Sequence, residues 1–210
     1  MTGLLKELKY ALYLIVHPFD AYWDLKHEKR GSLRTAIVIF ILFNLVLVAE
    51  NLFTGYIFGG RKNVDYNMFS TFWGTIGVMA LFCVGNWGLT CLSDGKGTMY
   101  DICTATAYAL VPYIIIHIPM IFLSNFFVQR EATFYAVFGM LATFWCAFLL
   151  LVSQIVTHQY TLFRALIVLF ATFVAMMAMA CLLILFVNLL QQVIVFASII
   201  IEEIYLRMKY

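Results

Sequence analysis

Charged residues are scarce in this sequence, and their scarcity argues against a soluble domain. Asp, Glu, Lys and Arg make up 11 % of the 210 residues, whereas apolar residues make up 64 %. A soluble domain carries about 25 % charged and about 45–50 % apolar residues. A chain of this size cannot bury so large an apolar excess in one core, so we expect the lipid bilayer to surround it. The net charge of +2, without a long basic run, gives no indication of a nucleic-acid partner.

The sequence also lacks Cys-x-x-Cys pairs, and we expect no cleavable leader. The five cysteines are odd in number and contain no Cys-x-x-Cys pair, which argues against a disulfide framework or a zinc site. We expect no metal and no cofactor, and we interpret the cysteines as small apolar side chains. The first apolar run, from Ala11 to Val16, is short and leads into His-Pro rather than a small-x-small cleavage site, so no signal peptide is predicted.

Long uncharged stretches are what the sequence does contain. A helix needs about 20 apolar residues to cross about 30 Å of hydrocarbon. The fold class we predict is therefore all-α, a polytopic membrane helical bundle of about five transmembrane helices with an N-terminal interfacial helix. The predicted spans are Thr35–Ile57, Met68–Leu92, Ile102–Leu123, Thr133–Val156 and Ala165 to about Leu190.

The last uncharged stretch is longer than one span requires. It runs for 37 residues, from Ala165 to Ile201, without a charge. We interpret it as one span that continues into an amphipathic or interfacial helix, with the change of environment at Gln191 and Gln192. A hairpin of two short spans is the alternative, although the stretch contains no Gly or Pro to form a turn.

The first 34 residues differ from the rest, so we divide the chain into an amphipathic segment at 1–34 and a transmembrane domain at 35–210. Apolar side chains from Leu4 to Val16 recur at helical spacing, which is typical of an interfacial helix. Pro18 suits the first turn of a second helix. A plain membrane anchor and a partner-binding role both stay open for this segment. We expect aromatic side chains at headgroup depth and basic ones facing water and anionic lipid: Phe19, Tyr22 and Trp23, and Lys26, Lys29, Arg30 and Arg34.

Lysine and arginine counts predict the orientation. With five spans, the side that holds the N-terminus carries eight of these residues near span ends, and the opposite side carries five. Basic residues concentrate on the cytoplasmic side of membrane proteins. We therefore expect a multi-pass protein of the cell membrane, with its N-terminus in the cytoplasm and its C-terminus outside.

Few polar residues lie within the predicted spans, and each is a candidate for function. Glu50 is the only acidic residue deep in a span, and His117 lies at the same predicted depth, so the two side chains could pair. A proton or cation site is one interpretation; a carboxyl group that hydrogen-bonds neighbouring helices together is the other. Asn44 and Asn86 are candidates for polar contacts between helices.

A glycine-containing loop, Ser93–Thr98, separates the second and third predicted spans. Its glycines permit a tight turn with positive φ. Asp94 or Thr98 is placed to cap the third span, with Asp101 in the first helical turn. The spacing does not match the Gly-x-x-x-x-Gly-Lys-Ser/Thr pattern of a nucleotide-binding loop.

Proline and glycine inside the spans predict local geometry. Pro112 and Pro119 each remove a helix hydrogen bond and should kink the third span. A kinked helix can line a cavity, although the kink can also be purely structural. Two pairs of small residues in the second span should permit close helix approach: Gly74 with Gly77, and Gly85 with Gly88.

The segment GKGTMYDICTATAYALVP resembles the Yip domain family, the Ypt/Rab-interacting membrane proteins and their prokaryotic relatives. Members carry a glycine-rich turn after the second span, then a Tyr and a Pro inside the third, and Gly95, Gly97, Tyr108 and Pro112 match that pattern. The stretch HPFDAYWDLKHEKRG is similar to the Pro-and-aromatic lead-in of bacterial members, with Pro18 as the matching residue.

The resemblance implies a five-span helical bundle. It implies a trafficking or membrane-shaping role only for eukaryotic members, which have a long cytosolic N-terminal tail and an Asp-Leu-x-Gly-Pro motif that this sequence lacks. It therefore points to the bacterial branch, for which it implies no settled activity.

These observations predict a non-enzymatic membrane protein, an accessory or scaffolding subunit of a transporter or of envelope machinery. Its partners would be the lipid bilayer, other membrane proteins or further copies of itself. The alternative is a small transporter or channel that uses Glu50 and His117, and a lipid-active enzyme is a third hypothesis. Glu202–Arg207 spells the Glu-Glu-x-x-x-Arg of CAAX-processing proteases, but the further motifs those enzymes need are not present, so we interpret it as a solvated helix face.

Overall fold

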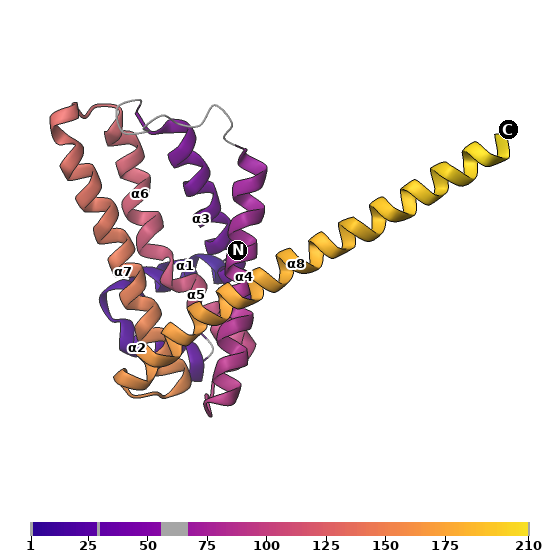
Figure 1. Cartoon of the computed structure of the whole chain (residues 1–210). Helices are drawn as coiled ribbons and strands as arrows, with labels where there is room; N and C mark the ends of the chain where they lie inside the picture. Colours follow the sequence, from indigo (N-terminus) through magenta and orange to yellow (C-terminus); the bar gives the residue numbers. More distant parts are fainter. Residues whose placement is uncertain (1, 29, 56–66, 210) are drawn as a thin grey trace.

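The computed structural model describes residues 2–28, 30–55 and 67–209, which form helices and loops without a strand (Figure 1). Five helical stretches of the described chain are long and apolar enough to span a membrane, so the predicted all-α, five-span architecture is confirmed. The helices are α1 (Thr2–Val16), α2 (Pro18–His27), α3 (Leu33–Phe53), α4 (Met68–Leu92), α5 (Met99–Ala109), α6 (Val111–Ser124), α7 (Ala132–His158) and α8 (Leu162–Lys209), with a 3-10 turn at Gln129–Glu131.

The third span consists of two helices, and Pro112 explains the break between them. The α5 helix ends at Ala109, and Pro112 occupies the first turn of α6, where its missing N–H leaves no hydrogen bond unmade. A 3-10-type hydrogen bond from Leu110 N to Ala107 O closes the junction. Pro119 lies inside α6, which continues past it to Ser124. Of the two predicted kinks, only the one at Pro112 divides the span into separate helices.

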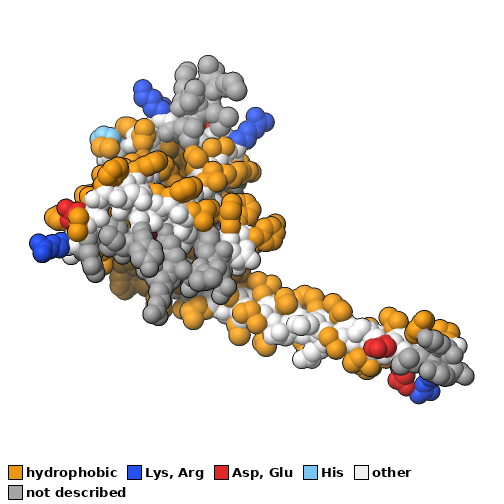
Figure 2. All heavy atoms as spheres, turned by 90° about the horizontal axis from the view of Figure 1, so that it is seen from above, with side chains coloured by type: hydrophobic (Ala, Val, Ile, Leu, Met, Phe, Trp, Pro, Cys, Tyr) orange, Lys and Arg blue, Asp and Glu red, His pale blue; other side chains and the backbone are white. Residues whose placement is uncertain are grey.

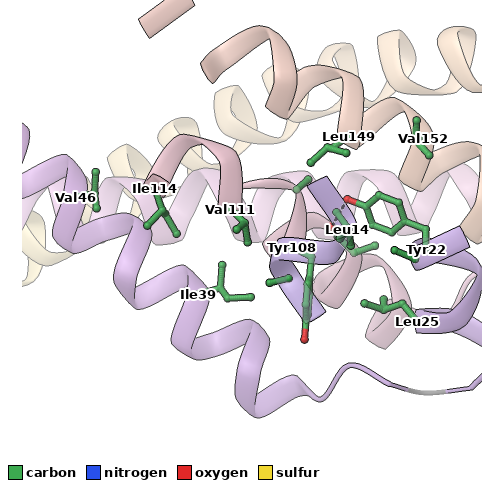
Figure 3. Packing of buried hydrophobic residues seen from close by; sticks show 14 of the residues in the cluster. Leu14, Tyr22, Leu25, Ile39, Val46, Tyr108, Val111, Ile114, Leu149 and Val152 are labelled. Carbon is green, nitrogen blue, oxygen red and sulfur yellow. Dashed lines mark hydrogen bonds between the residues drawn. The ribbon is translucent and has the colours of Figure 1, made fainter. Parts of the chain in front are cut away.

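The main core lies where the N-terminal helices meet the spans (Figure 3). Leu14 of α1 and Tyr22 of α2 are fully buried, and they pack among side chains of α3, α5, α6 and α7. The Tyr22 hydroxyl donates a hydrogen bond to Ala105 O across 3.4 Å. Tyr22, predicted to meet lipid headgroups, is instead covered by protein. The bundle covers one face of α1 and α2, while Val16, Phe19 and Trp23 keep exposed apolar side chains on the other.

Helix caps follow the sequence closely at two junctions. Ser32 caps α3 by accepting a hydrogen bond from Thr35 N. Thr98 caps α5 and forms a capping box with Asp101, in which each side chain accepts from the other residue's backbone N–H. The predicted cap at Thr98 is confirmed. Asp94, which was the other candidate, instead adopts a positive φ of 54° within the preceding loop.

The first half of α8 packs on α4, and Gly85 permits their close approach. A Cβ added at Gly85 would lie 2.9 Å from Met179 Cε. Asn86, the next residue, is fully buried and donates a hydrogen bond to Thr172 Oγ1 over 3.4 Å. The other glycines of this span have nothing within 4 Å of such a Cβ, so the close approach predicted at Gly74, Gly77 and Gly88 is absent.

The second half of α8 leaves the bundle. The helix is unbroken from Leu162 to Lys209, which excludes the hairpin alternative. It crosses the bundle obliquely and then projects away from it, and its C-terminus comes near the level of the upper ends of α3 and α6 (Figure 1). Seen from above, it is an arm covered with hydrophobic side chains, with charged groups gathered at its tip (Figure 2).

Candidate functional site

Three regions contain most of the residues singled out from the sequence: a polar junction at the lower end of the bundle, a carboxyl cluster between α3, α6 and α7, and the exposed half of α8. The lower junction joins the Ser93–Thr98 loop, the end of α7 and the N-terminal helices. It contains Gly95 and Gly97, while Tyr108 and Pro18 lie in the adjoining helices.

His158, the last residue of α7, is at the centre of the lower junction. It is 1 % exposed, and Nδ1 accepts a hydrogen bond from Gly97 N across 3.4 Å. Its ring stacks on Tyr160, with 5.4 Å between centroids. A Cβ at Gly97 would lie 2.7 Å from His158 Cε1, and one at Gly95 would lie 2.6 Å from Tyr160 Oη. The glycines therefore let the loop close over His158. Neither glycine has the positive φ that the sequence suggested.

Lys26 joins the N-terminal segment to the same junction. Its Nζ donates a hydrogen bond to Thr157 O in the last turn of α7, where a cation is favoured by the helix dipole. Burial lowers the pKa of Lys26, and the negative charge of Asp101 opposes that shift. The prediction that Lys26 faces water and anionic lipid did not include this contact: its side chain is only partly buried, and its ammonium group caps the end of α7. The sequence alone could not reveal this contact, since Lys26 and Thr157 are 131 residues apart.

Glu7 forms a second link between the N-terminal segment and the spans. Its carboxylate accepts hydrogen bonds from Ser32 Oγ, 2.6 Å away, and from Thr35 Oγ1. Partial burial would raise the pKa of Glu7, but these hydrogen bonds, together with Arg34, outweigh it and hold the pKa below its usual value. A carboxylate at the N-terminus of α3 also complements the helix dipole. Sequence analysis missed Glu7 because its partners belong to another helix.

Tyr108 and Pro18 lie in helices that adjoin this junction, and each contributes to the packing or the course of its helix. Tyr108 is fully buried in the core, and its hydroxyl oxygen finds no hydrogen-bond partner among the described residues. Pro18 begins α2 in the position predicted from its lack of an N–H. The short link through His17 then lets α2 fold back on α1, and Tyr10 Oη donates to Ala21 O over 2.7 Å.

Glu50 and His117 lie in one cluster, with Tyr113 between them. Tyr113 Oη donates a hydrogen bond to Glu50 Oε2 at 2.9 Å, and Tyr135 Oη lies 3.5 Å from Oε1. The His117 ring stacks on Tyr113 at 3.7 Å between centroids, and its Nδ1 lies 3.1 Å from Tyr113 O. The two residues therefore lie near each other, but the contact between the acid and the imidazole passes through a tyrosine that sequence analysis did not single out.

The cluster ties α3, α6 and α7 together near the upper end of the bundle. Nearby, Gly55 N donates to Ser124 Oγ at 3.0 Å, and Asn125 Nδ2 donates to Phe53 O at 3.1 Å. Beside these contacts, α3 and α6 form a groove of about 730 Å³ lined mostly by aliphatic side chains. The basic pair Arg61 and Lys62, counted for the orientation, lies outside the described residues.

The exposed half of α8 is a long helical segment without cover from the rest of the described chain. Every side chain from Cys181 to Tyr205 is exposed. Most are large and apolar, but Asn188, Gln191 and Gln192 interrupt them, and a hollow of about 620 Å³ follows that face. At the tip, Glu203 and Arg207 form an exposed ion pair at 2.6 Å, in agreement with a solvated face there.

Comparison with known proteins gives one match. A family model described as Yip1 domain matches residues 12–200. That range includes the lower junction, the carboxyl cluster and most of the exposed half of α8. Neither a curated protein nor a solved structure gives a match.

Proposed function

The chain belongs to the Yip1 domain family, and from that premise we propose that it is a non-enzymatic scaffolding or accessory subunit that binds other proteins within the membrane. The observation that carries the proposal is the exposed half of α8. A helix end of 25 residues, from Cys181 to Tyr205, has no cover from the rest of the described chain. Membrane helices associate through side-chain packing and interhelical hydrogen bonds, and this segment offers groups for both.

The remainder of the bundle supports the same role. Its polar side chains are used to hold helices together: Lys26 caps α7, Glu7 accepts from α3, and Tyr113 binds Glu50. A rigid bundle that presents one long free helix suits a subunit whose work is attachment. We place the protein in the cell membrane, with the lower junction in the cytoplasm.

Photo-crosslinking in intact membranes tests the proposal. A photoreactive amino acid replaces Val195, which is exposed on α8 beside the two in-line carboxamides, and in separate variants it replaces Phe138, which is exposed on α7, or Leu149, which is fully buried. We expect a discrete adduct of higher mass from position 195 and none from the other two. Adducts identified by mass spectrometry as protein would support the role; lipid adducts alone at position 195 would overturn it.

A second candidate is a small transporter or channel for protons or cations, favoured by the Glu50 carboxylate. Its oxygens face two tyrosine hydroxyls inside the bundle, and His117 stacks on one of those tyrosines. Intramembrane carboxylates commonly mark ion pathways. Reconstituted proteoliposomes should then show a flux that falls in Glu50→Gln and persists in Glu203→Gln, which alters only the exposed tip. A flux absent from the unaltered protein would remove this candidate.

A further inference from the structure

The exposed half of α8 has its polar groups arranged along one line. The residues at alternating spacings of three and four form a stripe, which we call the α8 seam: Cys181, Ile184, Asn188, Gln191, Val195 and Ser198. Spacings of this kind keep side chains on the face where two helices cross as a coiled coil. All six side chains are exposed, and both in-line carboxamides border the hollow on this face.

The carboxamides of the α8 seam are without partners in the described chain. The side-chain hydrogen bonds found in this half of α8 are those of Ser198 to Val195 O and of Arg207 to Glu203. The faces turned away from the seam carry Phe186, Leu190 and other large apolar side chains. A carboxamide surrounded by hydrocarbon must find a donor and an acceptor or remain unsatisfied at a substantial cost.

The direction of α8 keeps this face within the membrane layer. An interfacial helix lies in the membrane plane, so it would need a bend after the span, yet α8 is unbroken. The helix starts at the lower end of the bundle and its C-terminus comes near the level of the upper end (Figure 1). Since rise per residue is constant, the region around Asn188, about halfway along the 48 residues, lies midway between those levels. The polar side chains of this face therefore lie at a depth where hydrocarbon, and not water, surrounds the helix.

We propose that the α8 seam is a homodimer interface, in which a second copy of this chain pairs with it in parallel. The inference rests on the proposed scaffolding function and names its partner. Two copies inserted by the same signals have the same orientation, so a two-fold axis along the seam places each residue opposite itself. A carboxamide both donates and accepts hydrogen bonds. Across such an axis, Asn188 can therefore hydrogen-bond to Asn188 of the second copy, and Gln191 to Gln191. A different protein would need matching groups at the same spacing.

The ends of the charge-free stretch set limits on the interface. Glu202 continues the same spacing after Ser198, and in a parallel pair it would face a like charge. The seam therefore closes before the charged tip, which reaches the polar region of the membrane. At the other end, Thr172 is buried against Asn86, so pairing begins where α8 has separated from α4.

Cys181 provides the test, because it lies on the seam. The full-length protein carrying Cys91→Ser, which removes the other exposed cysteine, is oxidised in native membranes with copper phenanthroline and run on a non-reducing gel. We expect a dimer that reducing agent reverses. The matched control adds Cys181→Ser and Phe186→Cys, which moves the thiol to the opposite face of the same helix. That control should remain largely monomeric.

The carboxamides are tested in the same assay. One interhelical side-chain hydrogen bond in a membrane changes association by about threefold to tenfold. Asn188→Leu and Gln191→Leu should each reduce the crosslinked fraction by that factor, whereas Leu190→Ala should leave it unchanged.

Equal crosslinking at positions 181 and 186, or none at either, would overturn the homodimer. In the second case, a position-195 photo-adduct that contains a different protein would leave the scaffolding function standing. Absence of both products would refute the two proposals together. Crosslinking confined to Cys181 but unaffected by Asn188→Leu and Gln191→Leu would overturn the role assigned to the carboxamides.

Discussion

The phenol oxygen of Tyr113 lies 2.9 Å from Oε2 of Glu50, and this hydrogen bond joins α6 to α3. The same tyrosine ring lies against His117 on one side and meets Phe43 edge-on at 5.1 Å. One side chain thus connects the two ionisable groups that the sequence placed at a common depth. Its removal is the most direct test of what the cluster does.

Tyr113→Phe should destabilise the folded bundle by about 1 kcal/mol, the value of one side-chain hydrogen bond inside a membrane protein. The ring packing on Phe43 and His117 is retained, so the loss reports the hydroxyl alone. Thermal unfolding in mild detergent, followed by circular dichroism, measures the effect. Tyr205→Phe, which alters an exposed hydroxyl on α8, is the control and should have no effect; equal stability of both variants would contradict the assigned hydrogen bond.

Gly97→Ala should destabilise the lower junction by about 1–3 kcal/mol, the range for forcing extra atoms into a packed site. The added Cβ would lie 2.7 Å from His158 Cε1, and neither the α7 end nor the loop has room to yield without breaking the contact from Gly97 N to Nδ1. The comparison is Gly77→Ala, where the Cβ meets nothing within 4 Å.

Gly77→Ala should raise stability by about 0.5–1 kcal/mol, because alanine favours a helix interior more than glycine does. If the two substitutions change stability in opposite directions in the same detergent unfolding assay, the loss at Gly97 comes from local packing. It then does not come from a general intolerance of glycine substitution. Destabilisation of similar size at both positions would show that the space around Gly77 is filled in the native membrane.

These two glycines show what the sequence could and could not predict. The loop between the second and third spans, the cap at Thr98 and the break at Pro112 all follow from local chemistry, and the structure agrees with each. The purpose of Gly97 is not local. It depends on His158 and Thr157, which are about 60 residues further along the chain and reach the loop only through the fold.

The N-terminal segment shows the same limit on a larger scale. Its amphipathic pattern identifies two helices with an apolar face, but the pattern cannot tell whether lipid or protein covers that face. Tyr22 and Lys26 were therefore predicted at the membrane surface, whereas they pack against α5 and α7. The length and composition of the spans, by contrast, are set by the bilayer itself, and the described bounds of the first four were predicted to within a few residues. The fifth was not, because its apolar helix runs to Tyr205 and not to about Leu190.

Stability should fall in acid through Glu7. Its pKa is lower in the folded protein than in the unfolded chain, so its contribution is fully present above the unfolded value, near 4.5. That contribution is lost as pH falls through the lower, folded value, because protonation then removes an acceptor for Ser32 and Thr35. Unfolding followed from pH 7 to pH 3 should show this decline, and Glu7→Gln should flatten it. An unchanged pH profile in Glu7→Gln would assign the acid sensitivity to other groups.

The orientation of the bundle is the last prediction, and the structure sharpens its test. Contacts between distant segments hold the N-terminal helices, which carry several basic residues, at the lower end of the bundle. Lys26 contacts Thr157, and the Tyr100 hydroxyl donates to Gly31 O at 3.3 Å. These contacts place the N-terminal helices on the same side as the Ser93–Thr98 loop and the start of α8. One face therefore collects most of the positive charge, and we expect that face to lie in the cytoplasm.

Labelling of single introduced cysteines measures which side of the membrane each face lies on. Lys96→Cys and Arg130→Cys introduce exposed thiols at the lower and upper ends, in a background where Cys91 and Cys181 are serine. A maleimide that cannot cross membranes should label position 130 in intact cells, and position 96 only after the cells are opened. The reverse pattern would place the N-terminus outside. Labelling of both positions in intact cells would contradict the predicted topology, because α5 and α6 together should carry the chain across the membrane between residues 96 and 130.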